Sequence, residues 1–237
     1  MPQYGKVITD EGLQKDLQYL LRGIDCHGVL AEICPPRYGM QVLEPGCGSG
    51  KLGLWFAMRG CLVTLLDIDP QALEYARRLD GMARTNPSQY IHWDDPKRVK
   101  FVEGSILHLP YEDSVFDFVF NEGVPHHWGL SGSDWRRQRA INEMVRVTAI
   151  GGWTAVIGSN ALCPQTTEMA QKTEHTYLGM PPKQRPFKPA ELAERLLKAG
   201  LARETVQVRP VFFGWGRPDE SLYFHDTPLL VGYGRKL

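Results

Sequence analysis

Three glycines at alternate positions follow a short apolar run, and this segment constrains the fold more than any other part of the chain. Val42 and Leu43 have the character of a buried strand, and Gly46, Gly48 and Gly50 come soon after them. Glycine takes positive φ at no steric cost and, lacking a Cβ, lets the backbone approach a ligand closely. The segment predicts a tight strand-to-helix turn whose amides face a cofactor; a turn that binds nothing is the alternative.

The remaining composition restricts the classes of partner. The chain has 237 residues, a length that favours one large α/β domain. Its 27 basic and 27 acidic residues leave no formal net charge to attract DNA or another polyanion. Five cysteines without Cys-x-x-Cys spacing are typical of reduced thiols in a cytosolic protein. With no secretory signal and no long apolar run, we expect a cytoplasmic protein without a membrane segment, either a monomer or a homodimer.

Strand and helix patterns alternate along the chain. Helices are expected within 11–34, over 51–59, from Pro70 to Leu79, and over 135–147 and 190–199. Strands are expected at 41–43, 61–66, 100–103, 116–121, 153–158, 205–213 and 228–233, with a loop insertion over 81–98 and a turn at Gly151-Gly152. This order predicts a single doubly wound, Rossmann-like α/β domain. Its seven-stranded sheet is mostly parallel, with helices on both faces and an antiparallel C-terminal strand.

The residues around the glycines distinguish between cofactors. A dinucleotide fingerprint needs its third glycine at position 51, which is Lys51, so a nicotinamide-dependent oxidoreductase is disfavoured. Asp67 ends the second predicted strand, where an open α/β sheet offers a carboxylate to ribose hydroxyls. Asp69 and Pro70 then form a helix start, with Asp69 as the N-cap in preference to a ligand.

From about residue 41 to 160 the chain resembles the class I S-adenosylmethionine-dependent methyltransferases. The resemblance lies in four segments in the family's order: Val42 to Gly50, Val63 to Pro70, Phe101 to Ser105 with Leu109-Pro110, and Phe116 to Asn121 with His126-His127. Arg146-Val147 before Gly151-Gly152 resembles the helix end that precedes the family's fifth strand. The resemblance implies a helical lid over 1–38, a cofactor-binding core over 39–160, an acceptor-side insertion over 161–188 and a C-terminal helix with strands over 189–237.

The resemblance also implies a binding site for S-adenosylmethionine. Asp67 would bind both ribose hydroxyls, because two vicinal donors match the two oxygens of a carboxylate. Ile68 would pack on the adenine face. Ser105, where the family often has aspartate, would accept the adenine amino group more weakly, with Ile106 beside it. The other cofactor-binding residues expected are Glu44, Gly46, Cys47, Gly48 and Gly50 around the methionine portion, and Asn121 and Glu122 near the sulfonium.

Glu44 would bond the loop or the methionine ammonium. Cys47 has the alternative role of a small residue that the loop tolerates, and Glu122 that of orienting a basic acceptor or capping the next turn.

Methyl transfer from a sulfonium is an in-line displacement, so the enzyme mainly supplies proximity, alignment and exclusion of water. A protonated acceptor also needs a base, and histidine has a suitable pKa. His126 and His127 are the candidate catalytic residues, with packing of their loop as the alternative. Adjacent histidines without a carboxylate at a recognisable spacing make a metal site improbable, and we expect none.

The acceptor is expected to be a small, partly hydrophobic or aromatic molecule, methylated on oxygen or nitrogen more readily than on carbon. The reason is that aromatic residues gather in predicted loops, where they would line a pocket: Tyr90, Trp93, Trp128, Trp135, Tyr177, Phe212, Phe213, Trp215 and Tyr223. No Asn-Pro-Pro-Tyr type sequence follows the fourth strand, which removes one sign of methylation on nucleic-acid bases. A protein or RNA acceptor, and a cofactor-binding partner or regulatory subunit without turnover, remain as alternatives.

Overall fold

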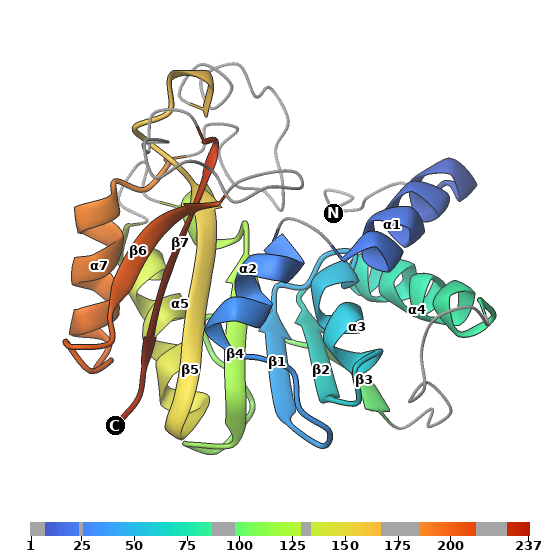
Figure 1. Cartoon of the computed structure of the whole chain (residues 1–237), viewed down its shortest axis with the longest axis horizontal. Coiled ribbons are helices and arrows are strands. Elements are labelled where there is room, and N and C mark those ends of the chain that lie inside the picture. The colour runs from blue at the N-terminus through green and yellow to red at the C-terminus, as the bar shows by residue number, and fades with distance from the viewer. Residues whose placement is uncertain (1–7, 24–25, 87–97, 129–133, 167–184, 212–226) are drawn as a thin grey trace.

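The computed structural model describes residues 8–23, 26–86, 98–128, 134–166, 185–211 and 227–237, and these contain a seven-stranded sheet flanked by helices (Figure 1). The strand order is β3-β2-β1-β4-β5-β7-β6. Strands β1 to β5 pair in parallel, whereas β7 is antiparallel to both of its neighbours. The predicted fold class is confirmed. The strands are β1 (Gln41–Pro45), β2 (Leu62–Asp67), β3 (Val99–Glu103), β4 (Phe116–Glu122), β5 (Thr148–Ser159), β6 (Gln207–Val211) and β7 (Leu229–Arg235).

Helices cover both faces of the sheet, because successive strand residues point to opposite sides and both sides are apolar. Val42 and Phe118 belong to one buried cluster, whereas the next residues, Leu43 and Val119, belong to the other. The first cluster is completed by α1 (Asp10–Arg22), α2 (Cys26–Ile33), α3 (Lys51–Ala57) and α4 (Pro70–Arg84), and the second by α5 (Asp134–Val147) and α7 (Pro189–Lys198).

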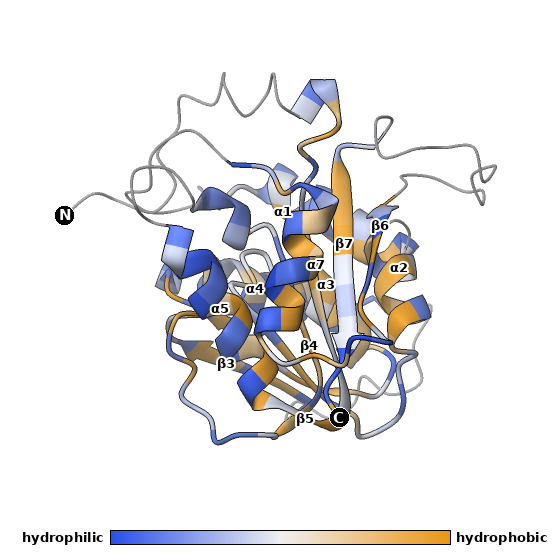
Figure 2. Cartoon of the chain, turned by 90° about the vertical axis from the view of Figure 1, so that its left-hand side faces the viewer, coloured by the Kyte–Doolittle hydropathy of each residue, from blue (hydrophilic) through white to orange (hydrophobic). Residues whose placement is uncertain are grey.

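Figure 2 shows hydrophilic and hydrophobic residues alternating along α5 and α7, as expected of helices with one face on a sheet. Within the described part of the chain, no helix has both the length and the apolar character needed to cross a membrane.

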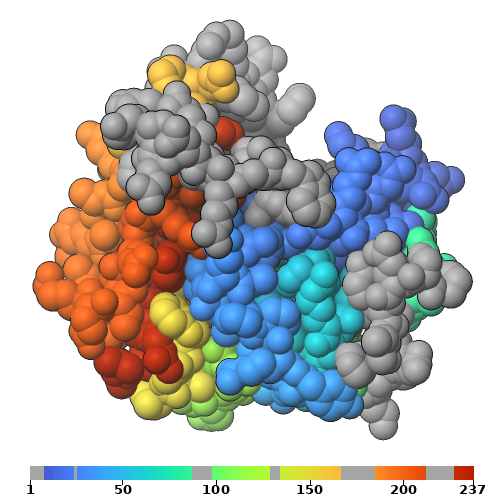
Figure 3. All heavy atoms as spheres, viewed as in Figure 1, coloured from blue at the N-terminus to red at the C-terminus, as the bar shows by residue number. Residues whose placement is uncertain are grey.

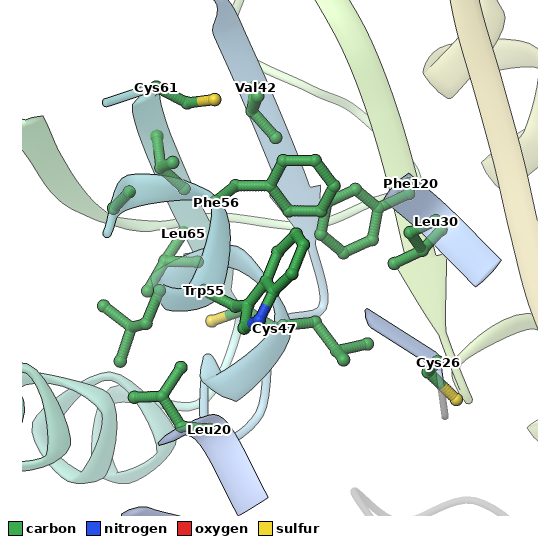
Figure 4. Close-up of a cluster of buried hydrophobic side chains, with 14 of the residues drawn as sticks. Leu20, Cys26, Leu30, Val42, Cys47, Trp55, Phe56, Cys61, Leu65 and Phe120 are labelled. Atoms are coloured by element: carbon green, nitrogen blue, oxygen red, sulfur yellow. The ribbon is translucent and has the colours of Figure 1, made fainter. Parts of the chain in front are cut away.

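Helix α3 is buried over most of its surface and fixes the glycine segment that precedes it. Figure 4 shows Phe56 beside Phe120, and the two ring centroids lie 5.5 Å apart. The ring of Phe118 lies 5.6 Å from that of Phe56, and Trp55 packs edge-on against Phe56. Truncating a buried phenylalanine of this kind to alanine costs roughly 3–5 kcal/mol. Helix α3, which the glycine segment enters at Gly50, is therefore held firmly against β4.

Helices α1 and α2 rest on the start of α3. Asp16 on α1 accepts a hydrogen bond from the Tyr75 hydroxyl on α4 at 2.9 Å and lies 3.9 Å from the Lys51 ammonium. On α2, the buried ring of His27 contacts the Lys51 carbonyl through Nε2 at 3.2 Å. Glu32 forms an ion pair with Arg209 of β6 at 2.8 Å, so that the surface of α2 adjoins the C-terminal strands in Figure 3. These contacts place both helices beside the residue that follows the glycine loop.

An ionic network attaches the segment after β3 to α5. Buried Glu143 accepts a hydrogen bond from the Leu109 amide at 2.9 Å and from the Arg146 guanidinium at 2.9 and 3.0 Å. Arg146 also donates to the carbonyls of Leu109 and Tyr111. These bonds attach the backbone that follows Ser105 to α5.

Two expectations about secondary structure were wrong. Helix α4 continues to Arg84, so the predicted loop insertion begins too early at 81. Gly81 lies inside the helix because Leu79 and Ala83, on either side of it, bury the same helix face. The rest of that insertion, 87–97, lies outside the described residues. Strand β5 begins at Thr148, so Gly151-Gly152 is not a turn before the strand but an irregularity within it, where Gly151 has φ 78° and the register to β4 shifts.

Candidate functional site

The candidate site lies at the carboxyl ends of β1, β2 and β4. Strand order reverses between β1 and β4, because β2 and β3 lie on one side of β1 while β4 and β5 lie on the other. Such a switch point leaves a crevice beyond the strand ends, where open α/β sheets bind their ligands. The glycine loop follows β1 at this point, and the segment from Asn121 to His127 follows β4 (Figure 1).

All three loop glycines have positive φ, of 72° at Gly46, 54° at Gly48 and 70° at Gly50. A Cβ on Gly46 would lie 2.5 Å from a Val124 methyl, and one on Gly50 would lie 2.7 Å from a Leu65 methyl. Internal packing therefore explains these two glycines. At Gly48 a Cβ would meet no atom within 4 Å, so this residue has open space in front of it.

The amides of Gly46, Cys47, Gly48 and Gly50 are used inside the protein, contrary to the expectation that those of Gly46 and Gly48 face a cofactor. Gly46 and Cys47 both donate to the Leu66 carbonyl, at 2.6 and 3.0 Å, and Gly48 donates to the Asp67 carboxylate at 2.8 Å. The loop thus offers a ligand its bare backbone at Gly48 and little else to bond. That open face is the feature a bound cofactor would fill.

Asp67 ends β2 and closes the loop from the other side. One carboxylate oxygen accepts the Gly48 amide and the other accepts the Asp69 amide at 3.0 Å. Burial raises the pKa of Asp67, and the hydrogen bonds from the two amides lower it in part. A carboxylate has about four lone-pair positions, so further acceptor capacity remains for ribose hydroxyls. The Asp69 side chain accepts the Gln71 amide at 2.9 Å, which confirms it as the N-cap of α4.

Ile68 is an exposed apolar residue within this otherwise buried segment. Its side chain is 53% exposed, whereas Asp67 and Asp69 beside it are buried. A large apolar side chain next to an open loop suits the flat face of an adenine ring.

Glu44 connects β1 to α3. Its buried carboxylate accepts the Gly53 amide at 2.8 Å, and a Cβ on Gly53 would lie 2.7 Å from the same oxygen. Burial holds the pKa of Glu44 well above its usual value, and the nearby charge of Glu122 adds to this effect. Burial likewise raises the pKa of the Cys47 thiol. The hydrogen bond between Glu44 and Gly53 joins the end of β1 to α3, the two elements that the glycine loop connects.

Asn121 links the ends of β4 and β1. Its amide nitrogen donates to the Pro45 carbonyl at 2.7 Å and its oxygen accepts the Val124 amide at 3.1 Å. Both polar ends of this buried side chain are thus engaged beside the glycine loop. Glu122, the last residue of β4, is only partly buried.

Ser105 and Ile106 follow β3 at the same edge of the sheet. The Ser105 hydroxyl accepts the Leu107 amide at 3.2 Å, and Ile106 is buried in the α5 and α7 cluster. The Ser105 hydroxyl is thus already engaged with its own turn.

The paired histidines lie in a short 3₁₀ turn, η2 (Pro125–His127), directly after β4. Nδ1 of His126 accepts the Ser159 amide at 3.3 Å, so the neutral ring carries its proton on Nε2. Burial, together with the charges of His127 and Arg137, holds the pKa of His126 well below its usual value. Burial lowers the pKa of His127 to about 4. Both rings are neutral at physiological pH, and the proton of His126 is on the nitrogen that does not face Ser159.

A group of charged residues beside His126 was not identified from the sequence. It comprises Asp134 and Arg137 on α5, Glu191 and Arg195 on α7, and Arg185 before α7. Helical spacing contained part of the signal, because Arg137 is three and four residues before the buried Ala140 and Ile141 and so shares their face. Asp134 is three residues away on the same helix, but Glu191 and Phe187 come from about fifty positions further along, which spacing cannot reveal.

Of the aromatic residues expected to line an acceptor pocket, two are described. Trp128 is buried and Trp135 is exposed. Tyr90, Trp93, Tyr177, Phe212, Phe213, Trp215 and Tyr223 lie outside the described residues, as do positions 167–184 of the predicted acceptor-side insertion.

Comparison with known proteins agrees with this geometry. Residues 43–156 match the family model of a methyltransferase domain. The chain is 30% identical over 123 residues to malonyl-[acyl-carrier protein] O-methyltransferase of Pectobacterium atrosepticum, covering 52% of this chain and 40% of that protein. It is 32% identical over 114 residues to probable tRNA methyltransferase 9B of Mus musculus, covering 48% and 20%. The chain thus spans less than half the length of these two relatives.

Solved structures share the fold over the whole chain. A methyltransferase from Thermotoga maritima superposes with a TM-score of 0.61 at 18% identity, covering 96% of each chain. The complex between the Trm112 methyltransferase activator of Haloferax volcanii and a methyltransferase gives a TM-score of 0.64 at 18% identity, covering 95% of this chain and 94% of that one. The sheet order, the glycine loop with its closing acid and the matched family model agree: residues 43–156 form a methyltransferase domain, and the chain shares the fold of the methyltransferases to which it is similar.

Proposed function

We propose that this methyltransferase acts on a small, partly hydrophobic or aromatic acceptor and methylates it on oxygen or nitrogen. The observation that carries the proposal is the set of side chains beside the end of β4. There the polar groups of His126 and Arg137 lie next to the aromatic ring of Phe187, and all three residues are buried. Small-molecule sites commonly combine apolar walls with a few placed polar groups.

The cofactor side of the site is assigned as follows. Asp67 would bind the ribose hydroxyls, Ile68 the adenine face, and the open backbone at Gly48 the methionine portion. Glu44, Gly46, Cys47, Gly50 and Asn121 would shape the loop without free donors, and Ser105 with Ile106 would meet the adenine edge. S-adenosylmethionine supplies a methyl group on a positively charged sulfur. The acceptor lone pair forms the new bond to carbon as the carbon–sulfur bond breaks and its electron pair passes to sulfur.

The histidines fit orientation better than proton removal. His126 offers an Nε2 proton to a ligand, since its Nδ1 accepts the Ser159 amide. With a pKa of about 4, His127 is unprotonated at pH 7 but is a weak base. The carboxylate of Glu122 lies near the expected position of the sulfur and is the other candidate to receive the proton of the acceptor. An acceptor that is already deprotonated needs none of these groups as a base.

Methyl transfer is tested directly with a panel of phenols, amines and carboxylic acids, measuring S-adenosylhomocysteine release by mass spectrometry. Isothermal titration with S-adenosylhomocysteine runs in parallel to establish cofactor binding. Turnover of a small acceptor that falls on truncating His126 or Phe187 supports the proposal. Cofactor binding without turnover of any panel member, together with a copurifying protein partner, would instead indicate a non-catalytic subunit.

An RNA acceptor is the second candidate, and two similarities favour it. A similar protein is named as a probable tRNA methyltransferase, and the superposed complex pairs a methyltransferase with its activator Trm112. Bulk tRNA is therefore included in the panel, with and without a Trm112 protein. Turnover of tRNA in the absence of small-molecule turnover would replace the small-acceptor proposal.

A further inference from the structure

Arg137 is a buried cation whose hydrogen bonds are unmade. The side chain is 0% exposed, and none of its three guanidinium nitrogens has a hydrogen-bond partner in the structure. Nη1 lies 3.1 Å from a Glu191 oxygen, which is ion-pair distance, but the alignment does not make a hydrogen bond. Burial lowers the pKa of Arg137 only to about 10, so the group stays charged at physiological pH. A buried charge with five unsatisfied N–H donors calls for an acceptor.

The neighbouring charges leave room for one negative group. The described cluster holds three guanidinium groups, Arg137, Arg185 and Arg195, against two carboxylates, Asp134 and Glu191. Both carboxylates are already engaged, because Arg195 bonds Asp134 at 2.8 Å and Glu191 at 3.0 Å. The excess is a single positive charge. Two helices, α5 and α7, also begin here, and their N-termini favour a further anion.

The unmade bonds lie next to the candidate acceptor side of the site. The Arg137 guanidinium stacks on Phe187, with Cζ 3.7 Å from the ring centroid. A Cβ on Gly158 would lie 2.9 Å from the same ring and 3.7 Å from Nδ1 of His126. Phe187 and His126 therefore both pack over Gly158, and Arg137 covers Phe187. Arg185, in the same charge cluster, donates its amide to the His126 carbonyl at 2.9 Å.

We propose that Arg137 binds a carboxylate group of the methyl acceptor, an inference that rests on the proposed function and narrows its substrate class to small organic acids. The planar fork of a guanidinium matches the two oxygens of a carboxylate. A monoanion balances the single excess charge, whereas a phosphate dianion would overcompensate it. The apolar part of the acid would lie against Phe187, with the Nε2 proton of His126 available to a second polar atom.

A purely structural role for Arg137 predicts a different behaviour. If the arginine only joined α5 to α7, its replacement would destabilise the fold. Replacing Arg137 by methionine keeps much of the volume on Phe187 and leaves two guanidinium groups facing two carboxylates. Removing one partner of a buried ion pair is costly when it leaves an uncompensated charge, but Glu191 keeps Arg195 at 3.0 Å and Arg185 at 3.8 Å in this variant. We expect Arg137→Met to fold with an unchanged or higher melting temperature without ligand.

The test uses the full chain saturated with S-adenosylhomocysteine and measures melting temperature with 10 mM benzoate or phenylacetate, both of which are monoanions at pH 7. Benzamide and phenylacetamide are the neutral counterparts, and inorganic phosphate is the alternative anion. The variants are Arg137→Met, Arg137→Lys, which keeps the charge but loses the fork, and Arg136→Gln. Arg136 is exposed on the same helix, so the last variant controls for the change of net charge.

We expect at least one carboxylate to raise the melting temperature of wild type and Arg136→Gln, with no effect of its amide. Its affinity should fall at least tenfold in Arg137→Met and by a smaller factor in Arg137→Lys. An equal shift in Arg137→Met, equal effects of the amides, a stronger Arg137-dependent effect of phosphate, or no effect of any carboxylate would each overturn the proposal. Cofactor binding in the same samples separates these outcomes from failure of the proposed function, since that function requires binding of S-adenosylhomocysteine.

Discussion

The open space beside Gly48 allows a substitution test of cofactor binding, and Gly39, at the other end of β1, is the matched control. Gly48→Ala places a methyl group where no protein atom lies within 4 Å, and φ there is 54°. Gly39→Ala does the same at the opposite end of β1, where φ is 77° and the space is equally empty. The left-handed conformation costs an alanine about 1–2 kcal/mol, partly offset by the smaller entropy of the unfolded chain. Both variants should therefore melt a few degrees below wild type, by similar amounts.

Their cofactor affinities should differ. If the methionine portion of S-adenosylmethionine lies on Gly48, the added methyl overlaps it, and overpacking costs about 1–3 kcal/mol. This corresponds to a loss of about 5- to 150-fold in affinity. Isothermal titration with S-adenosylhomocysteine should show this loss in Gly48→Ala and wild-type affinity in Gly39→Ala. Equal affinities in the two variants would show that the cofactor does not contact the open face of the loop.

Three further predictions follow from buried polar groups. Asp67→Asn should lower S-adenosylhomocysteine affinity roughly ten- to a hundred-fold by calorimetry, since it removes a charge-assisted acceptor; unchanged affinity would remove Asp67 from the ribose site. The unfolding free energy of wild type should fall relative to His126→Asn as pH drops below 6.5, by up to about 1.4 kcal/mol per pH unit. This is because the depressed pKa of folded His126 lets the unfolded chain bind the proton first; a pH-independent difference in urea titrations would contradict it. Glu143→Gln should cost roughly 1–3 kcal/mol, whereas Glu74→Gln, at an exposed pair with Arg78, should cost under about 1 kcal/mol.

The sheet could be predicted from the sequence because short stretches of neighbouring residues specify each strand and each turn. Each core strand is a short apolar run, and the turn chemistry between runs is explicit, as in the Asp69-Pro70 start of α4. The errors arose where local chemistry conflicted with packing. Gly81 continues a helix because Leu79 and Ala83 are buried around it, and Gly151 bends β5 without ending it because the strand is paired on both sides. Tertiary contacts decided both positions, and no window of sequence contains them.

The position of the glycine loop could be predicted from the sequence, but its hydrogen bonds could not. The glycine spacing places the loop, but the sequence does not show that Asp67 and the Leu66 carbonyl already occupy the amides of Gly46, Cys47 and Gly48. Hydrogen bonds between a loop and the neighbouring strand depend on the register of the strands, here β1 against β2. Only with that register known does Gly48 separate from the other two glycines as the one without an internal packing reason.

The acceptor side escapes sequence reasoning for a physical reason that Arg137 makes clear. An arginine among helix residues is ordinarily taken as exposed, because a charge is rarely buried without a partner. Its burial here depends on Phe187 and Glu191, which come from the segment about fifty residues further along the chain. The same segment denies the guanidinium a hydrogen bond, although it could have supplied an aligned carboxylate at little cost in sequence. Two carboxylates balance two of the three neighbouring arginines, and Arg137, the most buried of the three, is left without a hydrogen bond. This is the reason for the proposal that an anionic group of the methyl acceptor binds Arg137.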